Sequence, residues 1–330
     1  MTTEVILNNG EKVVLDGDGI VLLNKTAMDV NGAAFMQREL EYIKAKSYDV
    51  KYPELKARSL FPVSNEAGAG VTSITYRTYD QVGSAEIINA YANDLPRADV
   101  SGKETSIPVR TIGTSFGYTI TELEAGQLTG RPLDVRRGAA ARKAVEIAID
   151  NVAWNGDAES GLPGLLTNPN IPVGNVPNGA GGSALWANKT PAEILADVND
   201  IFNEIFQNTN MVEQGNTLLL PPEQWGILAT TRVDAVSDMT ILTFIVRNNP
   251  YIQSEADVIP VNQLTGAGTG GTDIMIAYDK SPEKLELEIP VELRFLPIQE
   301  RGLEFLIPGT SNIAGLNIYY PLSLNIKEGI

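Results

Sequence analysis

The residues that could do chemistry in this chain are carboxylates, because the sequence contains no cysteine and no histidine. Two carboxylate pairs lie close together in the sequence, Glu122 with Glu124 and Asp273 with Asp279. Paired carboxylates can act as a general acid and a general base, or bind a hard metal ion through oxygen. Neither pair has a supporting set of polar residues beside it, so a carboxylate-dependent hydrolase is the weaker interpretation.

A second candidate for metal chemistry is the run Asp16, Gly17, Asp18 and Gly19, which resembles half of a calcium-binding loop. The later ligands and the closing glutamate of such a loop are missing, so we predict a turn here. Without histidine and cysteine, imidazole and thiolate metal sites, disulfides and serine triads of the usual kind are excluded. No phosphate-binding loop or dinucleotide fingerprint follows a strand. We therefore predict no catalytic, cofactor-binding or metal-binding residues, and no enzyme activity.

Length and charge further limit the classes of function open to this chain. The chain has 330 residues and a formal net charge of −16. Nucleic-acid binding by phosphate neutralisation needs clustered lysine and arginine, which this balance does not favour. Simple solubility is one function that fits this charge. No apolar run approaches the roughly 18 residues of a membrane span, and the N-terminus lacks the features of a secretory signal.

The first 70 residues are typical of an arm rather than of a self-sufficient domain. Apolar residues between positions 5 and 15 predict a small hairpin, and a helical pattern with Phe35, Leu40 and Ile43 on one face predicts a helix over 33–45. An apolar patch at 60–63 needs a surface on which to dock. We expect this arm to lie against neighbouring subunits.

Residues 71–121 are typical of two long strands joined by a polar tip at about 93–105. An isolated hairpin is marginally stable in water, so this one is expected to lean on another chain. An ordinary hairpin within a β-rich core is the alternative.

A long alanine-rich helix is predicted from Pro132 to about Asn155. Ala141, Val145 and Ile149 recur every four residues and give it one apolar face, while Arg142 and Glu146 are spaced to pair. Gly156 is predicted to end the helix in a left-handed conformation. The sequence GLPGLL that follows predicts a sharp turn with no room for larger side chains.

The remainder divides into two further parts. Residues 191–280 alternate helical and strand patterns, which predicts a compact α/β domain that begins with Thr190 as helix cap and Pro191 in the first turn. Residues 281–330 are rich in strand patterns and are expected to return beside the long helix.

The helix and turn resemble those of the major capsid proteins of tailed bacteriophages and of encapsulins. The resemblance is carried by the following residues: Arg137, Ala140, Ala144, Asp150, Gly156, Asp157, Gly161, Leu162, Gly164, Leu165 and Leu166. The order of parts along the chain resembles the same fold over most of its length.

This resemblance implies an α+β capsid fold. Its parts would be an N-terminal arm at 1–70, an extended hairpin loop at 71–121, a peripheral domain with the spine helix at 122–190, an axial domain at 191–280, and peripheral strands at 281–330. It implies a major capsid protein that assembles into pentamers and hexamers of an icosahedral virion shell around double-stranded DNA.

The partners implied are copies of the same chain, with separate scaffolding, portal and decoration proteins possible. DNA contact would be weak and without sequence specificity, because an acidic wall would let packaged DNA slide past it. No membrane and no cofactor would be involved. Assembly would occur in the host cytoplasm. The alternative is an encapsulin-like compartment that holds a cargo enzyme. The roughly 70 residues before the hairpin favour the phage protein.

One capsid lineage crosslinks its subunits through a lysine on the extended loop and an asparagine on the peripheral domain. Lys103, expected at the hairpin tip, and Asn312, expected in a late loop, are the residues that could correspond. Neither aligns with the crosslinking pair, so a solvated lysine and a loop asparagine are the simpler prediction.

Overall fold

The computed structural model describes residues 3–6, 12–15, 53–84, 97–122, 124, 133–234 and 236–330. The chain forms two compact units, residues 1–53 and 54–330. In the first unit, β1 (Thr3–Ile6) pairs with β2 (Lys12–Leu15) in an antiparallel hairpin with Val5 opposite Val13, which confirms the predicted hairpin. The predicted helix over 33–45 and the half calcium loop at 16–19 lie outside the described residues.

The second unit contains a five-stranded sheet with the order β7-β16-β10-β8-β9. Its strands are β7 (Val173–Asn175), β8 (Thr217–Leu220), β9 (Val258–Pro260), β10 (Ile274–Tyr278) and β16 (Leu324–Glu328). Three helices accompany it: α5 (Pro191–Asn208), α6 (Pro222–Thr230) and α7 (Ile241–Asn248). The predicted cap is confirmed, because Thr190 and Glu193 form a capping box at the start of α5.

This sheet separates two hydrophobic cores. On one face, Leu219, Ile276 and Tyr278 join the core that includes the long helix. On the other face, Leu218 and Met275 join the core built on α5, α6 and α7. Because alternate residues of a strand point to opposite faces, a strand buried on both faces must be apolar throughout. The sequence TLLL of β8 satisfies that requirement.

The sheet reaches beyond the predicted 191–280 range on both sides. Strand β16 pairs antiparallel with β10, and β7 pairs parallel with β16. The predicted boundary at residue 280 therefore does not coincide with an edge of this sheet. Residues 324–328 lie in it, rather than beside the long helix with the other late strands.

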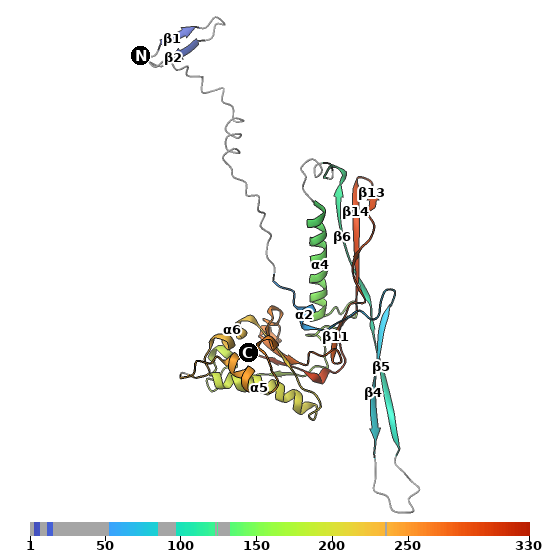
Figure 1. Ribbon diagram of the computed structural model, residues 1–330, viewed down its shortest axis with the longest axis vertical. Coiled ribbons are helices and arrows are strands. Elements are labelled where there is room, and N and C mark those ends of the chain that lie inside the picture. The colour runs from blue at the N-terminus through green and yellow to red at the C-terminus, as the bar shows by residue number, and fades with distance from the viewer. Residues whose placement is uncertain are drawn as a thin grey trace, which may run out of the picture. The chain divides into compact units, whose positions relative to one another are not determined.

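A second group of strands surrounds α4 (Leu133–Asn155), the predicted long helix. Strands β15 (Gly315–Ile318), β11 (Leu285–Glu288) and β3 (Val63–Ser64) form a three-stranded sheet. Strands β12 (Val291–Phe295), β13 (Gln299–Arg301) and β14 (Glu304–Ile313) form another, in which β14 also pairs with β6 (Arg110–Thr119) along its whole length. In Figure 1, α4 lies alongside β6 and β14.

The buried face of α4 receives the apolar patch that precedes β3. Leu60 and Phe61, in and after the short helix α2 (Ala57–Leu60), are buried, and the ring of Phe61 meets that of Trp154 edge-on at 5.4 Å. The predicted ion pair between Arg142 and Glu146 on the solvent side of α4 is wrong. Among the described residues, Glu146 pairs with Arg58 at 2.7 Å rather than with Arg142. None of the described helices is long and apolar enough to cross a membrane.

The hairpin consists of β4 (Ser73–Gly83) and β5 (Ala98–Pro108), and it projects from the other sheets as a separate two-stranded element. The prediction for the second strand of this hairpin is wrong. The partner of β4 is 98–108, much of which was expected to be the polar tip, whereas residues 110–119 pair with β14 instead. Cross-strand hydrogen bonding, rather than strand-forming side chains, orders the polar sequence ADVSGKE at the start of β5.

Candidate assembly surfaces

The turn after α4 is bound to the end of that helix by backbone hydrogen bonds. Leu165 N–H donates to the carbonyl of Ala153 at 3.0 Å, and Leu166 N–H donates to the carbonyl of Trp154 at 2.8 Å. The last carbonyls of a helix have no partner within it, so the turn supplies the missing donors. Gly156 adopts the predicted left-handed conformation, with φ of 67°. The turn is therefore a fixed part of the helix terminus.

Three backbone segments meet in this turn. A Cβ atom at Gly164 would lie 2.1 Å from the amide nitrogen of Gly156. On the other side, Gly315 has φ of 82°, and a Cβ there would lie 2.5 Å from the carbonyl oxygen of Pro163. The Leu316 N–H donates to that same carbonyl at 3.0 Å. Glycine at these positions therefore lets α4, the turn and β15 pack at van der Waals distance. The GLPGLL sequence predicted the part of this packing that lies within the turn.

The hairpin presents two different faces. Its inner face lines a cavity of about 900 Å³, together with residues of the exit turn and the segment after β15. The hairpin residues of that lining alternate along each strand: Tyr76, Thr78 and Asp80 of β4, and Ser101, Lys103, Thr105 and Ile107 of β5. The ring of Tyr76 meets that of Tyr319 edge-on at 5.0 Å. The opposite, outer face therefore points away from the cavity.

The two residues considered for a crosslink are placed differently from the expectation. Lys103 lies within β5, opposite Thr78, and not at the tip of the hairpin. Asn312 lies in β14 and not in a loop, and its Oδ1 accepts a hydrogen bond from the Thr111 hydroxyl at 3.0 Å. No contact between Lys103 and Asn312 occurs in the described part of the chain. The structure does not bring them together within one subunit.

Three of the candidate carboxylates, Glu122, Asp273 and Asp279, each have another polar partner. The Arg137 guanidinium, 2.8 Å from Glu122, and the Thr119 backbone N–H lower the pKa of Glu122 to about 2. Asp273 and Asp279 flank β10 at its opposite ends. Asp273 accepts from Gln224, and Asp279 accepts from Asn216. Within the described ranges, no group of three or more carboxylates could hold a metal ion.

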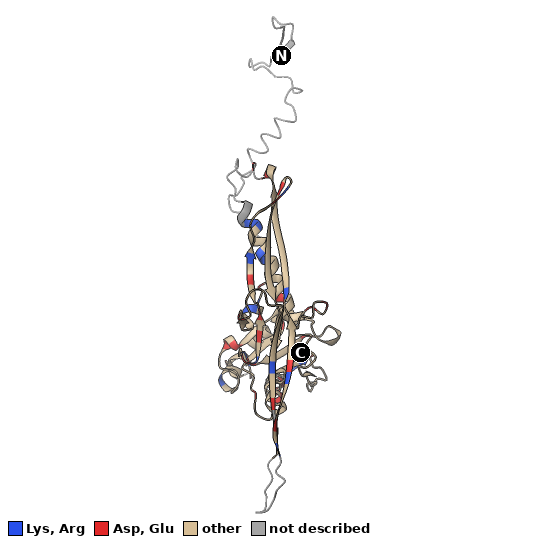
Figure 2. Ribbon diagram, turned by 90° about the vertical axis from the view of Figure 1, so that its right-hand side faces the viewer, with Lys and Arg blue, Asp and Glu red and all other residues tan. Residues whose placement is uncertain are grey.

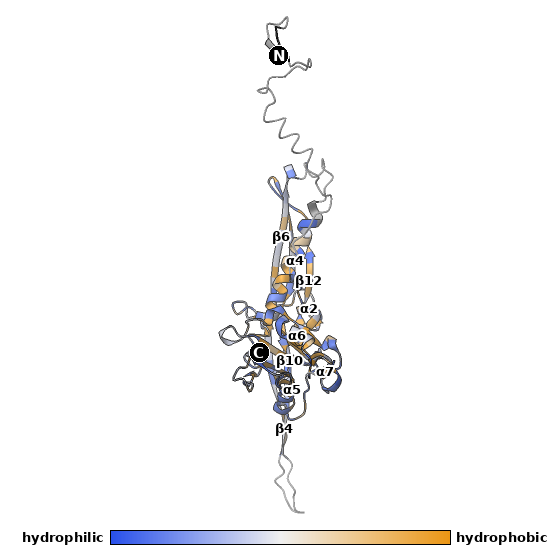
Figure 3. Ribbon diagram, turned by 90° about the vertical axis from the view of Figure 1, so that its left-hand side faces the viewer, coloured by the Kyte–Doolittle hydropathy of each residue, from blue (hydrophilic) through white to orange (hydrophobic). Residues whose placement is uncertain are grey.

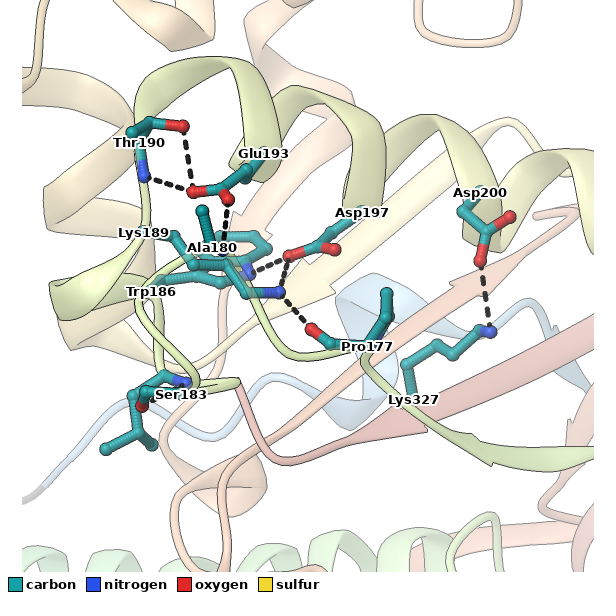
Figure 4. A network of polar contacts seen from close by, with 11 residues as sticks. Pro177, Ala180, Ser183, Trp186, Lys189, Thr190, Glu193, Asp197, Asp200 and Lys327 are labelled. Carbon is teal, nitrogen blue, oxygen red and sulfur yellow. Dashed lines mark hydrogen bonds and ion pairs between the residues drawn. The ribbon is translucent and has the colours of Figure 1, made fainter.

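A buried ion pair that the sequence analysis missed fixes the loop before α5. Lys189 Nζ lies 2.6 Å from Asp197, and their side chains are 1% and 4% exposed. Asp197 also accepts from the Trp186 indole at 3.0 Å, while Lys189 donates to the carbonyl of Pro177 at 2.7 Å (Figure 4). The sequence could have revealed this buried charge, because Asp197 lies within the apolar stripe of α5 defined by Ile194 and Val198.

Glu193 fixes the same loop from the other side. Its carboxylate accepts from the backbone N–H groups of Ala180 and Thr190. These hydrogen bonds, with that of Ala180 the largest contribution, lower the pKa of Glu193 to about 2. The capping residue therefore also anchors the Gly/Asn/Pro loop, an arrangement that can be followed in Figure 4.

A second buried polar cluster lies on the three-stranded sheet. The Tyr319 hydroxyl donates to Glu286 at 3.0 Å and lies 3.5 Å from Glu288. Within the described residues, one oxygen of Glu288 and both side-chain polar atoms of Asn317 have no hydrogen-bond partner. Burial, followed by the charge of Glu286, raises the pKa of Glu288. The cluster therefore binds a proton more tightly in the folded protein than in the unfolded chain.

We expect Glu288→Gln to stabilise the protein at pH 8 by on the order of 1 kcal/mol, a usual size for one substitution. The folded state retains a proton on Glu288 that the unfolded state loses above its ordinary pKa. Stability should therefore fall as pH rises from that value through the raised one, and the glutamine variant should lack this fall. Urea unfolding at pH 5 and pH 8 measures it, with the exposed Glu300→Gln as control. A variant less stable than wild type at both pH values would contradict the assignment.

Comparison with known proteins agrees with this architecture. The capsid of the Myoviridae phage XM1 matches with a TM-score of 0.76 and 20% identity, covering 89% of this chain and 98% of that one. The capsid of a native GTA particle matches with a TM-score of 0.58 and 12% identity, covering 92% and 99%. A virus-like particle from Pyrococcus furiosus matches with a TM-score of 0.51 and 15% identity, covering 82% and 91%. No curated protein matches the sequence.

The fold is therefore that of a subunit of a viral protein shell, as predicted. The model of the family described as major capsid protein matches residues 83–330, three quarters of the sequence. The chain belongs to the major capsid protein family and is a structural protein of the phage capsid. As a member of that family, it is a component of the shell of the virion. The encapsulin alternative is not favoured.

Proposed function

We propose that this chain assembles into pentamers and hexamers that close an icosahedral shell around the double-stranded DNA of a tailed phage. Closed rotational symmetry lets one surface of the chain serve every copy in a ring. The observation that carries the proposal is the hairpin, which has an exposed outer face and only two strands. Because a two-stranded sheet is marginal by itself, neighbouring copies complete its stability.

Each predicted segment takes one part in this assembly. The arm at 1–70 and the hairpin segment at 71–121 contact neighbours. The peripheral parts at 122–190 and 281–330 form the wall, with α4 as its spine. The domain at 191–280, completed by β7 and β16, closes the rings.

Several further properties belong to the same proposal. The protein has no enzyme activity, cofactor or membrane contact, and it assembles in the host cytoplasm. Separate scaffolding, portal and decoration proteins are possible further partners. The net charge of −16 suits a wall that contacts DNA weakly and without sequence specificity.

Negative-stain electron microscopy of the chain expressed alone, after size-exclusion chromatography, tests the proposal. We expect closed shells, or rings of five and six subunits, and shells formed in the host should contain DNA only when the packaging machinery is present. A 35.6 kDa monomer that stays monomeric at high concentration, with and without co-expressed phage assembly proteins, would contradict it.

A further inference from the structure

The three-stranded sheet β15-β11-β3 has one apolar face and one polar face. Leu285 and Leu287 of β11 join the core that includes α4, whose apolar residues are visible in Figure 3. Because side chains alternate along a strand, Glu286 and Glu288 lie on the opposite face. Glu288 is buried, with 5% of its surface exposed. A buried carboxylate needs a positive charge, a proton or several hydrogen bonds beside it.

Strand β15 and the residue after it add an amide and a hydroxyl to this polar face. Asn317 is the register partner of Glu286. Tyr319 continues the pairing, because its backbone N–H donates to the carbonyl of Lys284 at 2.9 Å. The Tyr319 hydroxyl lies 3.0 Å from an oxygen of Glu286 and 3.5 Å from an oxygen of Glu288. Two carboxylates of one strand therefore meet around one hydroxyl of the neighbouring segment.

Three polar atoms of this cluster have no hydrogen-bond partner among the described residues. They are Oε2 of Glu288 and both Oδ1 and Nδ2 of Asn317, which is fully buried. Burial raises the pKa of the Tyr319 hydroxyl, and Asn317 opposes that rise because its side chain faces the hydroxyl. Buried polar atoms in folded proteins nearly all have a partner. The two free oxygens therefore indicate a ligand that accepts oxygen donors.

The cluster carries negative charge with no base to balance it. The ion pairs formed by the described residues all involve other carboxylates. Lys284, just before β11, pairs with Glu213 at 2.6 Å. Ser64, the register partner of Glu288 on β3, is neutral. Carboxylates that lie together without a base favour the binding of a cation.

The chemistry of the donors selects the kind of cation. Carboxylate and amide oxygens suit hard cations such as calcium and magnesium, whereas imidazole and thiolate suit softer metals. Calcium accepts about six to eight oxygens in irregular geometry, while magnesium requires a nearly ideal octahedron. Side chains held on two paired strands have little freedom to form an octahedron, so calcium fits better. Tyr319 also lines the cavity on the inner face of the hairpin, which gives the ion and its water molecules a route from solvent.

We propose that Glu286, Glu288 and Asn317 bind a calcium ion, and that Tyr319 orients the Glu286 carboxylate by its hydrogen bond. Oε2 of Glu288 and Oδ1 of Asn317 supply two of the ligands, and water molecules complete the coordination. The ion links β11 to β15 beside Tyr319, whose ring meets that of Tyr76 near the base of the hairpin. Calcium therefore stabilises the junction from which the hairpin projects. This site replaces the sequence-based expectation that the chain has no metal-binding residue.

Calcium binding to the whole chain is measured by isothermal titration calorimetry after the protein has been treated with EDTA. Acidic residues occur in several parts of the ribbon in Figure 2 and attract divalent cations weakly, so the buffer contains about 0.15 M NaCl to screen them. The test variant is Glu288→Gln, which removes one ligand charge and keeps the shape of the side chain. The matched control is Glu300→Gln, which removes the same charge from the exposed strand β13.

We expect one site per chain, with an affinity that falls at least about tenfold in Glu288→Gln and changes less than about twofold in Glu300→Gln. Magnesium should bind the wild type at least about tenfold more weakly than calcium. Equal affinity of Glu288→Gln and wild type, or no saturable binding at millimolar calcium, would overturn the inference. In the latter case buried water hydrates the free oxygens. Equal affinity for the two cations would overturn the assignment to calcium.

Urea unfolding separates ion binding from a purely structural role of Glu288. A ligand that binds only the folded state stabilises it in proportion to the logarithm of its concentration. Calcium should therefore raise the urea midpoint of the wild type and leave that of Glu288→Gln unchanged. In EDTA the variant should be at least as stable as the wild type, because the buried charge has been removed. An equal rise of both midpoints in calcium would place the ion elsewhere and overturn the inference. Neither measurement requires that shells form, so failure of the proposed function would be seen separately.

Discussion

A Gly164→Val variant is expected to lose the packed turn at the end of α4 and to form no shells. Its Cβ would lie 2.1 Å from the Gly156 nitrogen and 2.5 Å from the Asn155 carbonyl carbon, and both are backbone atoms that cannot rotate away. The turn must therefore separate from the helix, breaking the hydrogen bonds of Leu165 and Leu166. Such a change should cost more than about 4 kcal/mol, the range of severe single substitutions. Thermal unfolding and electron microscopy measure the two effects.

Gly113→Val is the matched control for this experiment. Gly113 lies in β6, and a Cβ there would meet nothing within 4 Å. Valine also favours strands, so this variant should melt at or above the wild-type temperature and assemble normally. Normal shells and an unchanged melting temperature for Gly164→Val would show that the turn yields more easily than its contacts indicate.

Lys189→Met is expected to destabilise the protein by about 3–5 kcal/mol, the cost of leaving one member of a buried ion pair unpaired. Asp197 would remain 4% exposed, with the Trp186 indole as its remaining hydrogen-bond donor. Burial already raises the pKa of Asp197 despite the lysine beside it. The deficit should therefore shrink as pH falls, because protonation removes the unpaired charge. Denaturant unfolding from pH 5 to pH 8 measures it.

The double variant Lys189→Met with Asp197→Asn separates charge from packing. Asparagine keeps an acceptor for Trp186 but carries no charge, so most of the lost stability should return. Arg77→Met is the control, because the Arg77–Glu104 pair is exposed and should contribute less than about 1 kcal/mol. If the double variant is as unstable as Lys189→Met alone, the loss comes from packing and not from the unpaired carboxylate.

The parts of the fold that were predictable are those whose information is local. The long helix with its glycine exit, the capping box at Thr190 and the apolar strand TLLL are each specified by residues a few positions apart. The pairing of β6 with β14 joins residues nearly 200 positions apart, and no pattern in either strand identifies its partner. Strand β5 was placed too late in the sequence because its first residues are polar and exposed on both faces.

The same division applies to the candidate surfaces. That Gly164 has no room for a side chain followed from the turn sequence, but its counterpart Gly315 could not be identified from the sequence. Gly315 lies close to Pro163 only because β15 packs beside the turn. The edge-on contact between the rings of Phe116 and Phe295 depends likewise on strands from distant parts of the chain. Lys103 and Asn312 were individually plausible, and only the strand registers show that each has another environment.

The pairing of β16 with β10 has a consequence for the order in which the protein is made. Strand β10 leaves the ribosome with one neighbour, β8, already synthesised, and its other edge stays open until residues 324–328 have been translated. An incomplete translation product therefore lacks a central strand of the sheet and cannot finish this domain. We therefore expect chains that end before residue 324 to leave one edge of β10 unpaired and to assemble less readily than the full sequence.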